Sequence, residues 1–447
     1  MRRGVLVLSV ALLLGPASAL AQTVAGQQAP VTLGVDVFST LNPRPPSSMI
    51  TQPQRLVPGE PVAPAGAERP IGYQAGNIII YPVVTGGAFY DDNVFALNTN
   101  RQGDWAGFVR PEIGWRSNNW ANAQMAGAAF VEKRWYSKFT SEDQLNAGAA
   151  VGGTVQPDAN TQLVGRMQYL HAHEDRGTSD SVTTAFANPL QYDQFEAAGA
   201  INKRYDRFWT SLGAAAAWIN FRDATLNGVS INQDYRNGVI GRVPFRFGYV
   251  VAPNTSVFME VSGNRRDFKA DPFDSYGYRV VGGALFEPGP GSRIRGEVFG
   301  GYMFQDYSGT GFQTVSTWTI GSALAFLLMP NLTAVLESRR DAKEASLSGG
   351  VVAGDGVSVV ETLVAGRIDY AVAPNVVIGG GVAYLVDEYK GANRTDRSWS
   401  PLAAARWFVN PRLTLGFDYR YLGFDSSGLG VVGYFRNVYM FSANVKL

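Results

Sequence analysis

The sequence predicts an all-β fold, a transmembrane antiparallel up-and-down β-barrel of about 18 strands preceded by a Pro-rich N-terminal arm. Two observations predict it. From residue 76 to residue 447, long segments alternate apolar side chains with small or polar ones. The connections between these segments alternate between short turns and longer polar loops. This combination is typical of barrels whose apolar outer face is covered by lipid.

The N-terminus predicts secretion. Arg2 and Arg3 precede an apolar run over residues 4–15, and Ala19-Leu20-Ala21 supplies the small residues expected before a cleavage site. This is the pattern of a signal peptide over residues 1–21, and a short buried helix is the alternative. Downstream of it there is no run of about 18 apolar residues, so membrane-spanning helices are not expected. We therefore expect the mature chain in the cell outer membrane.

Residues 22–75 are rich in proline. Asn42-Pro43-Arg44-Pro45-Pro46 is the densest stretch, and further prolines follow up to Pro70. Because proline lacks the backbone donor that a sheet requires, we expect an irregular arm, placed in the periplasm or in the mouth of the pore as a plug. A plain linker is the alternative. The barrel is then expected over residues 76–447.

Alternation is clearest near the C-terminus. Over residues 413–421 the leucines and aromatics fall on one face, and Asp418 and Arg420 fall on the other. Pro-Asn pairs at 253–254, 330–331 and 374–375 form short turns, because proline presets φ and asparagine tolerates a left-handed backbone. Polar stretches such as 341–356 and 388–397 are predicted to be long loops at the opposite end.

Charged residues at the inward positions of this alternation form a candidate lumen-lining set, because Arg or Lys on the lipid side costs about 2–4 kcal/mol at the midplane. The set is Arg110, Glu112, Arg166, Arg242, Arg246, Arg266, Arg295, Glu297, Glu361, Arg367, Asp369, Asp418, Arg420 and Arg436. Such a lumen could filter or guide an anionic chain. The alternative, favoured by the mixture of acids and bases, is a set of paired charges that stiffens the wall.

Composition excludes several other functions. The chain has no cysteine, so disulfides and thiolate metal sites are excluded, and its net charge of +1 gives no reason to expect a nucleic-acid partner. Its two histidines, His171 and His173, are spaced for a metal but sit at a strand end, where a solvated loop edge is the favoured interpretation. No nucleophile motif accompanies them. We expect neither enzymatic activity nor a cofactor.

One stretch resembles a known family. Gly76-Asn77-Ile78-Ile79-Ile80-Tyr81-Pro82, followed by Tyr90-Asp91-Asp92-Asn93-Val94-Phe95, is similar to the opening signature of the putative β-barrel porin type 2 family. The signature positions are Gly76, Pro82, Tyr90, Asp91, Asp92 and Asn93. The resemblance covers residues 76–447 and implies a large single-chain outer-membrane barrel. Some relatives are associated with export of exopolysaccharide or capsule.

A passive transport barrel is therefore expected, with passage of exopolysaccharide or another polymer ahead of general diffusion of small solutes. A barrel enzyme or an adhesin is the class left open. Asp91-Asp92-Asn93 could bind calcium through oxygen ligands, although a capped turn is favoured. The expected partners are outer-membrane lipid and lipopolysaccharide, the barrel assembly machinery and, for a polymer exporter, periplasmic polysaccharide-export proteins.

Overall fold

The computed structural model describes residues 72–117, 122–174, 176–177, 186–287, 292–346, 356–428 and 431–447. Its main element is one antiparallel sheet in which 18 strands follow one another around a closed ring. The ring closes because the first barrel strand pairs with the last. The predicted barrel and its strand number are confirmed. The predicted signal peptide (1–21) and the arm up to residue 71 lie outside the described residues.

The barrel strands fall into two groups separated by a long loop. The first group is β2 (Ile78–Asp91), β3 (Asp104–Ser117), β4 (Ala123–Tyr136), β5 (Gln144–Asp158), β6 (Thr161–His173), β7 (Gln191–Tyr205) and β8 (Phe208–Phe221). The second group is β11 (Gly238–Ala252), β12 (Thr255–Phe268), β13 (Ser275–Phe286), β14 (Ile294–Tyr307), β15 (Val315–Met329), β16 (Leu332–Ser346), β17 (Gly356–Ala373), β18 (Val376–Tyr389), β19 (Arg394–Asn410), β20 (Leu413–Ser426) and β21 (Tyr434–Lys446).

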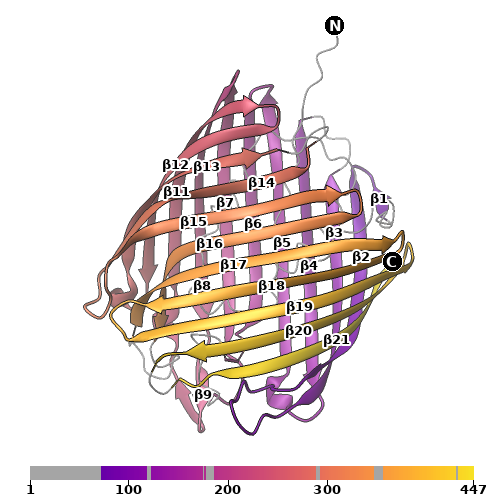
Figure 1. Cartoon of the computed structure of the whole chain (residues 1–447), viewed down its shortest axis with the longest axis vertical. Helices are drawn as coiled ribbons and strands as arrows, with labels where there is room; N and C mark the ends of the chain where they lie inside the picture. Colours follow the sequence, from indigo (N-terminus) through magenta and orange to yellow (C-terminus); the bar gives the residue numbers. More distant parts are fainter. Residues whose placement is uncertain are drawn as a thin grey trace.

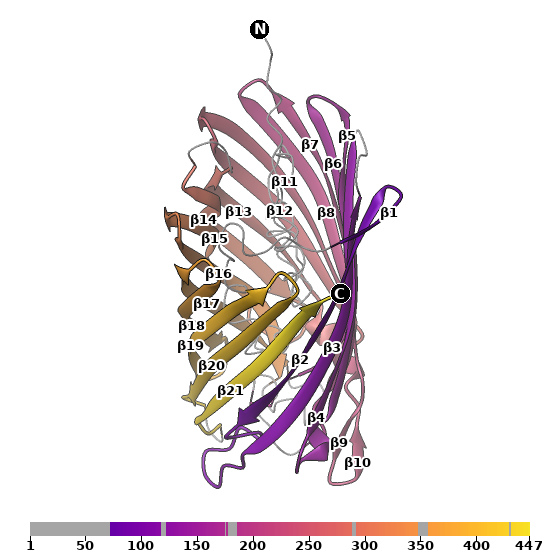
Figure 2. The same ribbon diagram turned by 90° about the vertical axis from the view of Figure 1, so that its right-hand side faces the viewer.

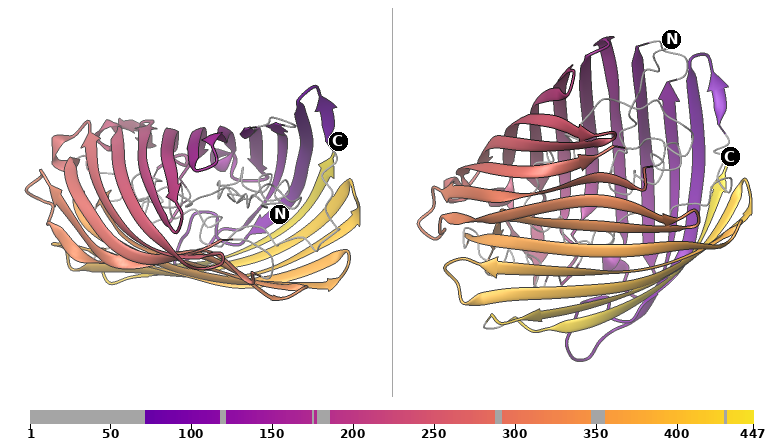
Figure 3. Two further views of the ribbon diagram at one scale, coloured as in Figure 1. Left: turned by 90° about the horizontal axis from the view of Figure 1, so that it is seen from above. Right: turned by 45° about the horizontal axis from the view of Figure 1, so that its top comes forward.

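The two groups form opposite walls. In Figure 1, β11–β21 run across the front while β2–β8 run behind them at a steep angle. Figure 2, turned by 90°, places β21 beside β2, where Val83 pairs with Lys446 and Asp91 with Val438. From above, the walls curve around an interior (Figure 3). Full closure leaves no long unpaired edge, which is the condition for a sheet in lipid.

Side chains alternate between the two faces as the sequence predicts. On β11, Val243, Phe245 and Phe247 are 54%, 48% and 46% exposed, whereas Arg246 is 1% exposed. Large apolar side chains are thus exposed outside and the guanidinium is covered inside. Only an apolar solvent makes such an outer face favourable. No helix in the described part of the chain is long and apolar enough to cross a membrane.

Most turns at one end of the barrel are short. Residues 253–254, 330–331 and 374–375 each join two strands directly, as the Pro-Asn pairs predict. Asn254 has φ of 60° and Asp206, in a two-residue turn that we did not predict, has φ of 55°. Both residue types accept this left-handed conformation readily. The start of β2 and the end of β21 lie at the same end of the barrel, as an even strand number requires.

Connections at the other end are mostly longer, but two predicted boundaries are wrong. β16 continues to Ser346 and β17 begins at Gly356, so both ends of the loop predicted over 341–356 are strand, and residues 347–355 lie outside the described residues. β18 and β19 likewise reduce the loop predicted over 388–397 to residues 390–393. The physical reason is that charged residues in these stretches pair with one another on strands. Polarity alone therefore does not mark a loop here.

Several short elements complete the fold. β1 (Tyr73–Ala75) pairs with the start of β2 through a turn at Gly76, which has φ of 61°. Between β8 and β11, β9 (Ala224–Leu226) and β10 (Val229–Ile231) form a small hairpin that projects from the long-loop end (Figure 2). Single 3₁₀ turns, η2 (Thr140–Glu142), η3 (Asp234–Arg236) and η4 (Asp271–Phe273), lie in the loops.

Candidate functional site: the charged interior of the barrel

The structure covers most of the predicted lumen-lining residues and leaves one in solvent. Arg166, Arg246, Glu297, Glu361, Arg367 and Asp369 are buried. Half-buried positions are Arg110, Glu112, Arg242, Arg266, Asp418, Arg420 and Arg436. Arg295 is exposed, near the start of β14 and next to Gly296, whose φ of 114° interrupts the regular strand. The set therefore divides into covered groups along the wall and one free residue at the short-turn end.

Most members of the set form ion pairs. The pairs include Arg110–Glu112 at 3.0 Å, Arg166–Glu196 at 3.3 Å, Arg246–Glu297 at 2.9 Å, Arg266–Glu344 at 2.6 Å, Arg367–Asp369 at 2.8 Å and Arg406–Asp418 at 2.8 Å. Because each cation in these pairs has a nearby carboxylate, this part of the wall presents polar groups without a large field of one sign. Such pairing also holds the long side chains in fixed positions.

Glu260 is the centre of the densest group, and sequence reasoning missed it. Its carboxylate is 0% exposed and accepts hydrogen bonds from Arg242 at 2.8 Å, Arg246 at 2.6 Å and Arg279 at 2.7 Å. Glu297 accepts another from Arg246 at 2.9 Å. The group thus holds three guanidinium ions and two carboxylates. Alternation could have found Glu260, since the residues on either side of it, at 259 and 261, are exposed.

Aromatic rings beneath the arginines are a second feature that we did not predict. A guanidinium carbon lies over a ring at Arg110–Phe130 (3.9 Å), Arg246–Phe258 (4.7 Å), Arg279–Phe299 (4.9 Å), Arg236–Phe221 (3.9 Å) and Arg394–Tyr389 (4.2 Å). Each of these arginines also contacts a carboxylate. The repeated unit is therefore an aromatic side chain, a guanidinium group stacked on it and a carboxylate that pairs with the guanidinium. Packing and charge together fix the position of the arginine.

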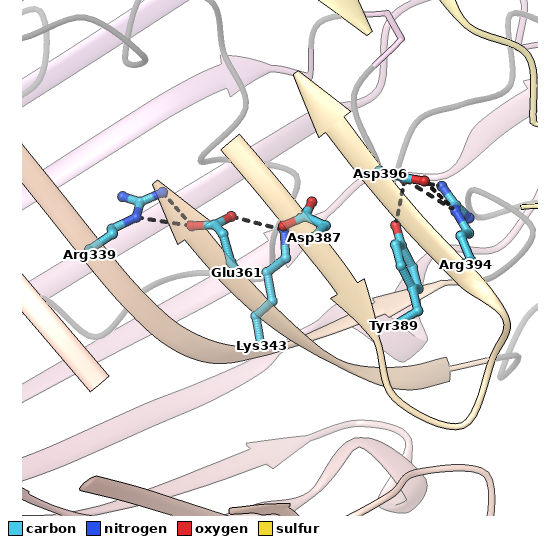
Figure 4. A network of polar contacts seen from close by, with 7 residues as sticks. All are labelled: Arg339, Lys343, Glu361, Asp387, Tyr389, Arg394 and Asp396. Carbon is cyan, nitrogen blue, oxygen red and sulfur yellow. Dashed lines mark hydrogen bonds and ion pairs between the residues drawn. The ribbon is translucent and has the colours of Figure 1, made fainter. Parts of the chain in front are cut away.

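A further network joins β16, β17 and β18 (Figure 4). Glu361 accepts hydrogen bonds from Arg339 Nε at 3.0 Å and from Lys343 Nζ at 2.9 Å. Lys343 also donates to Asp387 at 3.0 Å. Since Glu361 and Asp387 are both 1% exposed, the lysine between them compensates two covered negative charges. This network holds the base of the β16–β17 hairpin.

The inward end of this hairpin, residues 341–346 and 356–361, extends beyond the pairing with β15, while residues 359–361 still pair with β18. β15 pairs with β16 only as far as Ile320 and Arg340, although β15 itself continues to Val315. Beyond that point β16 pairs only with β17, up to Ser346 and Gly356. Freed from its neighbour on one side, the hairpin can bend away from the barrel wall.

Its contacts place the inward end inside the ring. Arg266 on the inner face of β12 donates to Glu344 at 2.6 Å and to the carbonyl of Ala342 at 2.9 Å. Three strands separate β12 from β16 along the wall, so this contact cuts across the interior. Ala342 also packs in one cluster with Met303 of β14 and with Val360. Residues 356–361 are all buried, which requires cover on both faces. The inward end therefore narrows the interior near the long loops.

The resemblance motif lies at the barrel seam. Asp91 Oδ2 accepts a hydrogen bond from Arg436 Nε at 2.7 Å, and Asp92 accepts two from Asn437 at 2.7 and 2.8 Å. Asn93 donates to the carbonyl of Phe435 at 2.8 Å. Its own N–H donates to Asp91 Oδ1 at 3.0 Å, so the backbone turn is capped. These three side chains tie the first strand to the last.

The rest of the motif surrounds this seam. Gly76 makes the turn into β2, Pro82 accepts a hydrogen bond from the Leu447 N–H at 3.0 Å, and Tyr90 packs on Trp105 with ring centroids 5.4 Å apart. The histidines are engaged separately, His171 with Asp193 at 2.9 Å and His173 with Asn146 at 3.0 Å. Among the described residues, no group of three or more His, Asp or Glu side chains is arranged to hold a metal ion.

The match to a known family agrees with this geometry. The sequence profile of the family described as Putative beta-barrel porin 2 matches residues 67–447. No curated protein matches the chain. Similar solved structures include OccAB4 of Acinetobacter baumannii, with 11% identity, a TM-score of 0.42 and coverage of 84% of this chain and 99% of that one. OpdO of Pseudomonas aeruginosa is 14% identical, with a TM-score of 0.42 and coverage of 82% and 97%. The chain belongs to the Putative beta-barrel porin 2 family and is a porin-like β-barrel of the outer membrane.

Proposed function

We propose that this barrel is a passive channel that guides an extended, hydroxyl-rich polymer, an exopolysaccharide, across the outer membrane. The observation that carries the proposal is the paired interior. Ion pairs such as Arg246–Glu297 and Arg367–Asp369 supply many hydrogen-bonding groups while cancelling most of the charge. A wall of this kind solvates a polar chain without binding one sign of ion tightly. Barrels of about 16–18 strands are wide enough to enclose an aqueous path.

The driving force for a polymer would come from outside the barrel. The fold supplies a path and no energy source, so a periplasmic polysaccharide-export partner would deliver the chain to the short-turn end. That end faces the periplasm because short turns in outer-membrane barrels lie there. Exposed basic side chains at this end, including Arg207, Arg293 and Arg412, offer contacts for an acidic polymer or partner.

The narrowing by the inward end of the hairpin favours a second candidate, diffusion of small solutes. A liposome-swelling assay with neutral sugars of increasing length separates the two. Alongside the full chain, a shortened variant would join Ala342 to Val360, which are paired in register, through an Asn-Gly turn. For a polymer channel, the full chain passes long oligosaccharides and the shortened variant passes them faster. For a small-solute porin limited by the hairpin, the full chain passes only short sugars.

A matched control removes a hairpin that lies outside the path. Replacing residues 225–230 by an Asn-Gly turn shortens the projecting β9–β10 hairpin and should leave swelling unchanged. In cells, loss of the gene should abolish surface polysaccharide, and the full chain should restore it. Normal surface polysaccharide in the deletion strain would overturn the polymer proposal and leave the small-solute channel.

A further inference from the structure

The outer face of the barrel carries a hollow of about 450 Å³ beneath the long loops. Its floor includes the aromatic side chains of Tyr169, Phe195 and Trp218, which are 44%, 40% and 43% exposed. Gln194 and Ile219, which precede Phe195 and follow Trp218, are 2% and 3% exposed and face the interior. Because successive side chains on a strand point to opposite faces, Phe195 and Trp218 face outward. The hollow therefore opens toward the membrane and not toward the pore.

The upper edge of the hollow is polar. Asn220 and Lys269 line it near the ends of β8 and β12, and Asp267 lies in the same register row as Val239 and Trp218. Trp218 lies three residues before the end of β8, which places its backbone about 10 Å back along the strand at 3.3 Å per residue. An aromatic floor below a charged edge matches the boundary between acyl chains and headgroups.

Three basic side chains lie on or near this edge, and Lys269 lines the hollow together with Asp193 and Asp267. The side chains of Arg222, Arg265 and Lys269 are 56%, 78% and 61% exposed. Their carboxylate contacts measure 3.5 Å for Arg222, 3.9 Å for Arg265 and 2.7 Å for Lys269. Exposed pairs of this kind contribute little to stability, so the cations can turn to another anion. A phosphate offers them charge-assisted hydrogen bonds of the same kind.

We propose that this hollow binds one phosphorylated, acylated glycolipid of the outer leaflet, the lipid A part of lipopolysaccharide. An acyl chain would lie on Trp218 and Phe195, and a sugar phosphate would contact Arg222 and Lys269. The site is on the lipid-facing surface at the long-loop end, which faces outward in outer-membrane barrels. Position selects this occupant, since the outer leaflet supplies lipid A there, and the exposed cations at the edge supply contacts for its phosphate. The proposal rests on the membrane location and is independent of what the pore transports.

The test measures binding of purified lipopolysaccharide to the delipidated full chain in mild detergent, by native mass spectrometry. The wild type should retain one molecule and lose it with dephosphorylated lipopolysaccharide. Substituting Arg222→Gln together with Lys269→Gln should weaken binding tenfold or more, and Trp218→Ala severalfold. Arg397→Gln is the matched control, because Arg397 is exposed on the outer side of β19, away from the hollow.

Heat-modifiable migration in gels shows whether each variant is folded, so weak binding cannot be mistaken for misfolding. Equal binding by the wild type and the double variant would overturn the proposal. So would equal binding of phosphatidylglycerol, which would make the hollow a general phospholipid contact. A dimer that excludes lipopolysaccharide and dissociates on Trp218→Ala would assign the surface to a second copy of the chain instead.

Discussion

Replacing Glu260 by glutamine removes the charge at the centre of the densest interior group while keeping the side chain's shape. In the wild type this carboxylate lies 2.6–2.8 Å from three guanidinium groups and is 0% exposed. Loss of one partner from a buried charge group typically costs about 3–5 kcal/mol, because the remaining charges lose their compensation. We therefore expect Glu260→Gln to lower the free energy of unfolding by roughly that amount.

The same substitution should change ion selectivity. Three arginines and two glutamates leave one positive charge in excess, and Glu260→Gln leaves two. If the group faces the path, reversal potentials under a salt gradient in planar bilayers should move toward anions, and the shift should shrink at high salt because of screening. Urea unfolding of the barrel in detergent, followed by tryptophan fluorescence, measures the stability change.

Glu337→Gln is the matched control. Glu337 lies on β16, half-buried, and pairs in register with Ala365 on the inner face. Within the described residues, no ion pair is found for it, so its substitution should change stability by less than about 1 kcal/mol. Equal effects of the two substitutions on stability, or a small effect of Glu260→Gln, would refute the reasoning that the Glu260 group is a compensated cluster.

Three further predictions concern the hairpin, the seam and pH. Glu344→Gln removes the ion pair that holds the inward end of the hairpin to Arg266. A loss of about 3 kcal/mol shifts the equilibrium between barrels with this hairpin docked and undocked about a hundredfold, so liposome swelling with oligosaccharides should become faster. Unchanged swelling rates would contradict this prediction. Asp91→Asn breaks the ion pair with Arg436 and should lower the temperature at which the barrel unfolds and changes its migration in gels. The same temperature for the wild type and the variant would show that the seam does not depend on this ion pair. Burial raises the pKa of Glu287, in the turn after β13, from 4.5 to about 7. Because the pKa of Glu287 is higher in the folded state, the stability it confers is complete below pH 4.5 and is lost as pH rises through 7. The free energy of unfolding, measured from pH 4 to 8, should therefore decline with pH in the wild type and decline less in Glu287→Gln.

The sequence predicts the barrel well because the lipid environment imposes a period of two on every strand. Phe245 and Arg246 are adjacent, yet one faces lipid and the other faces the barrel interior. This alternation of apolar and polar residues can be recognised in the sequence alone. Turn chemistry is equally local, so Pro253-Asn254 fixes its own position. Strand number and closure follow from these two signals.

The interior contacts could not be predicted in the same way. Alternation predicts that Arg246 points into the barrel. The sequence around it does not predict that Arg246 donates hydrogen bonds to Glu260 and Glu297, which lie on other strands. Residues 341–344 resemble a polar loop in the sequence, because the sequence does not show that Arg266 of β12 pairs with Glu344 inside the barrel. Pairing of charges depends on register between strands far apart in the chain. Sequence therefore supplies only part of the list of interior charges, and the structure supplies the rest and their partners.

Thiol labelling in intact outer membranes tests the central claim most directly, because the chain has no cysteine of its own. Leu336 and Glu337 are neighbours on β16 that face lipid and lumen respectively. A charged, membrane-impermeant maleimide should label Glu337→Cys through the aqueous lumen and leave Leu336→Cys unlabelled. Labelling of Leu336→Cys with protection of Glu337→Cys would contradict the assignment of the two faces.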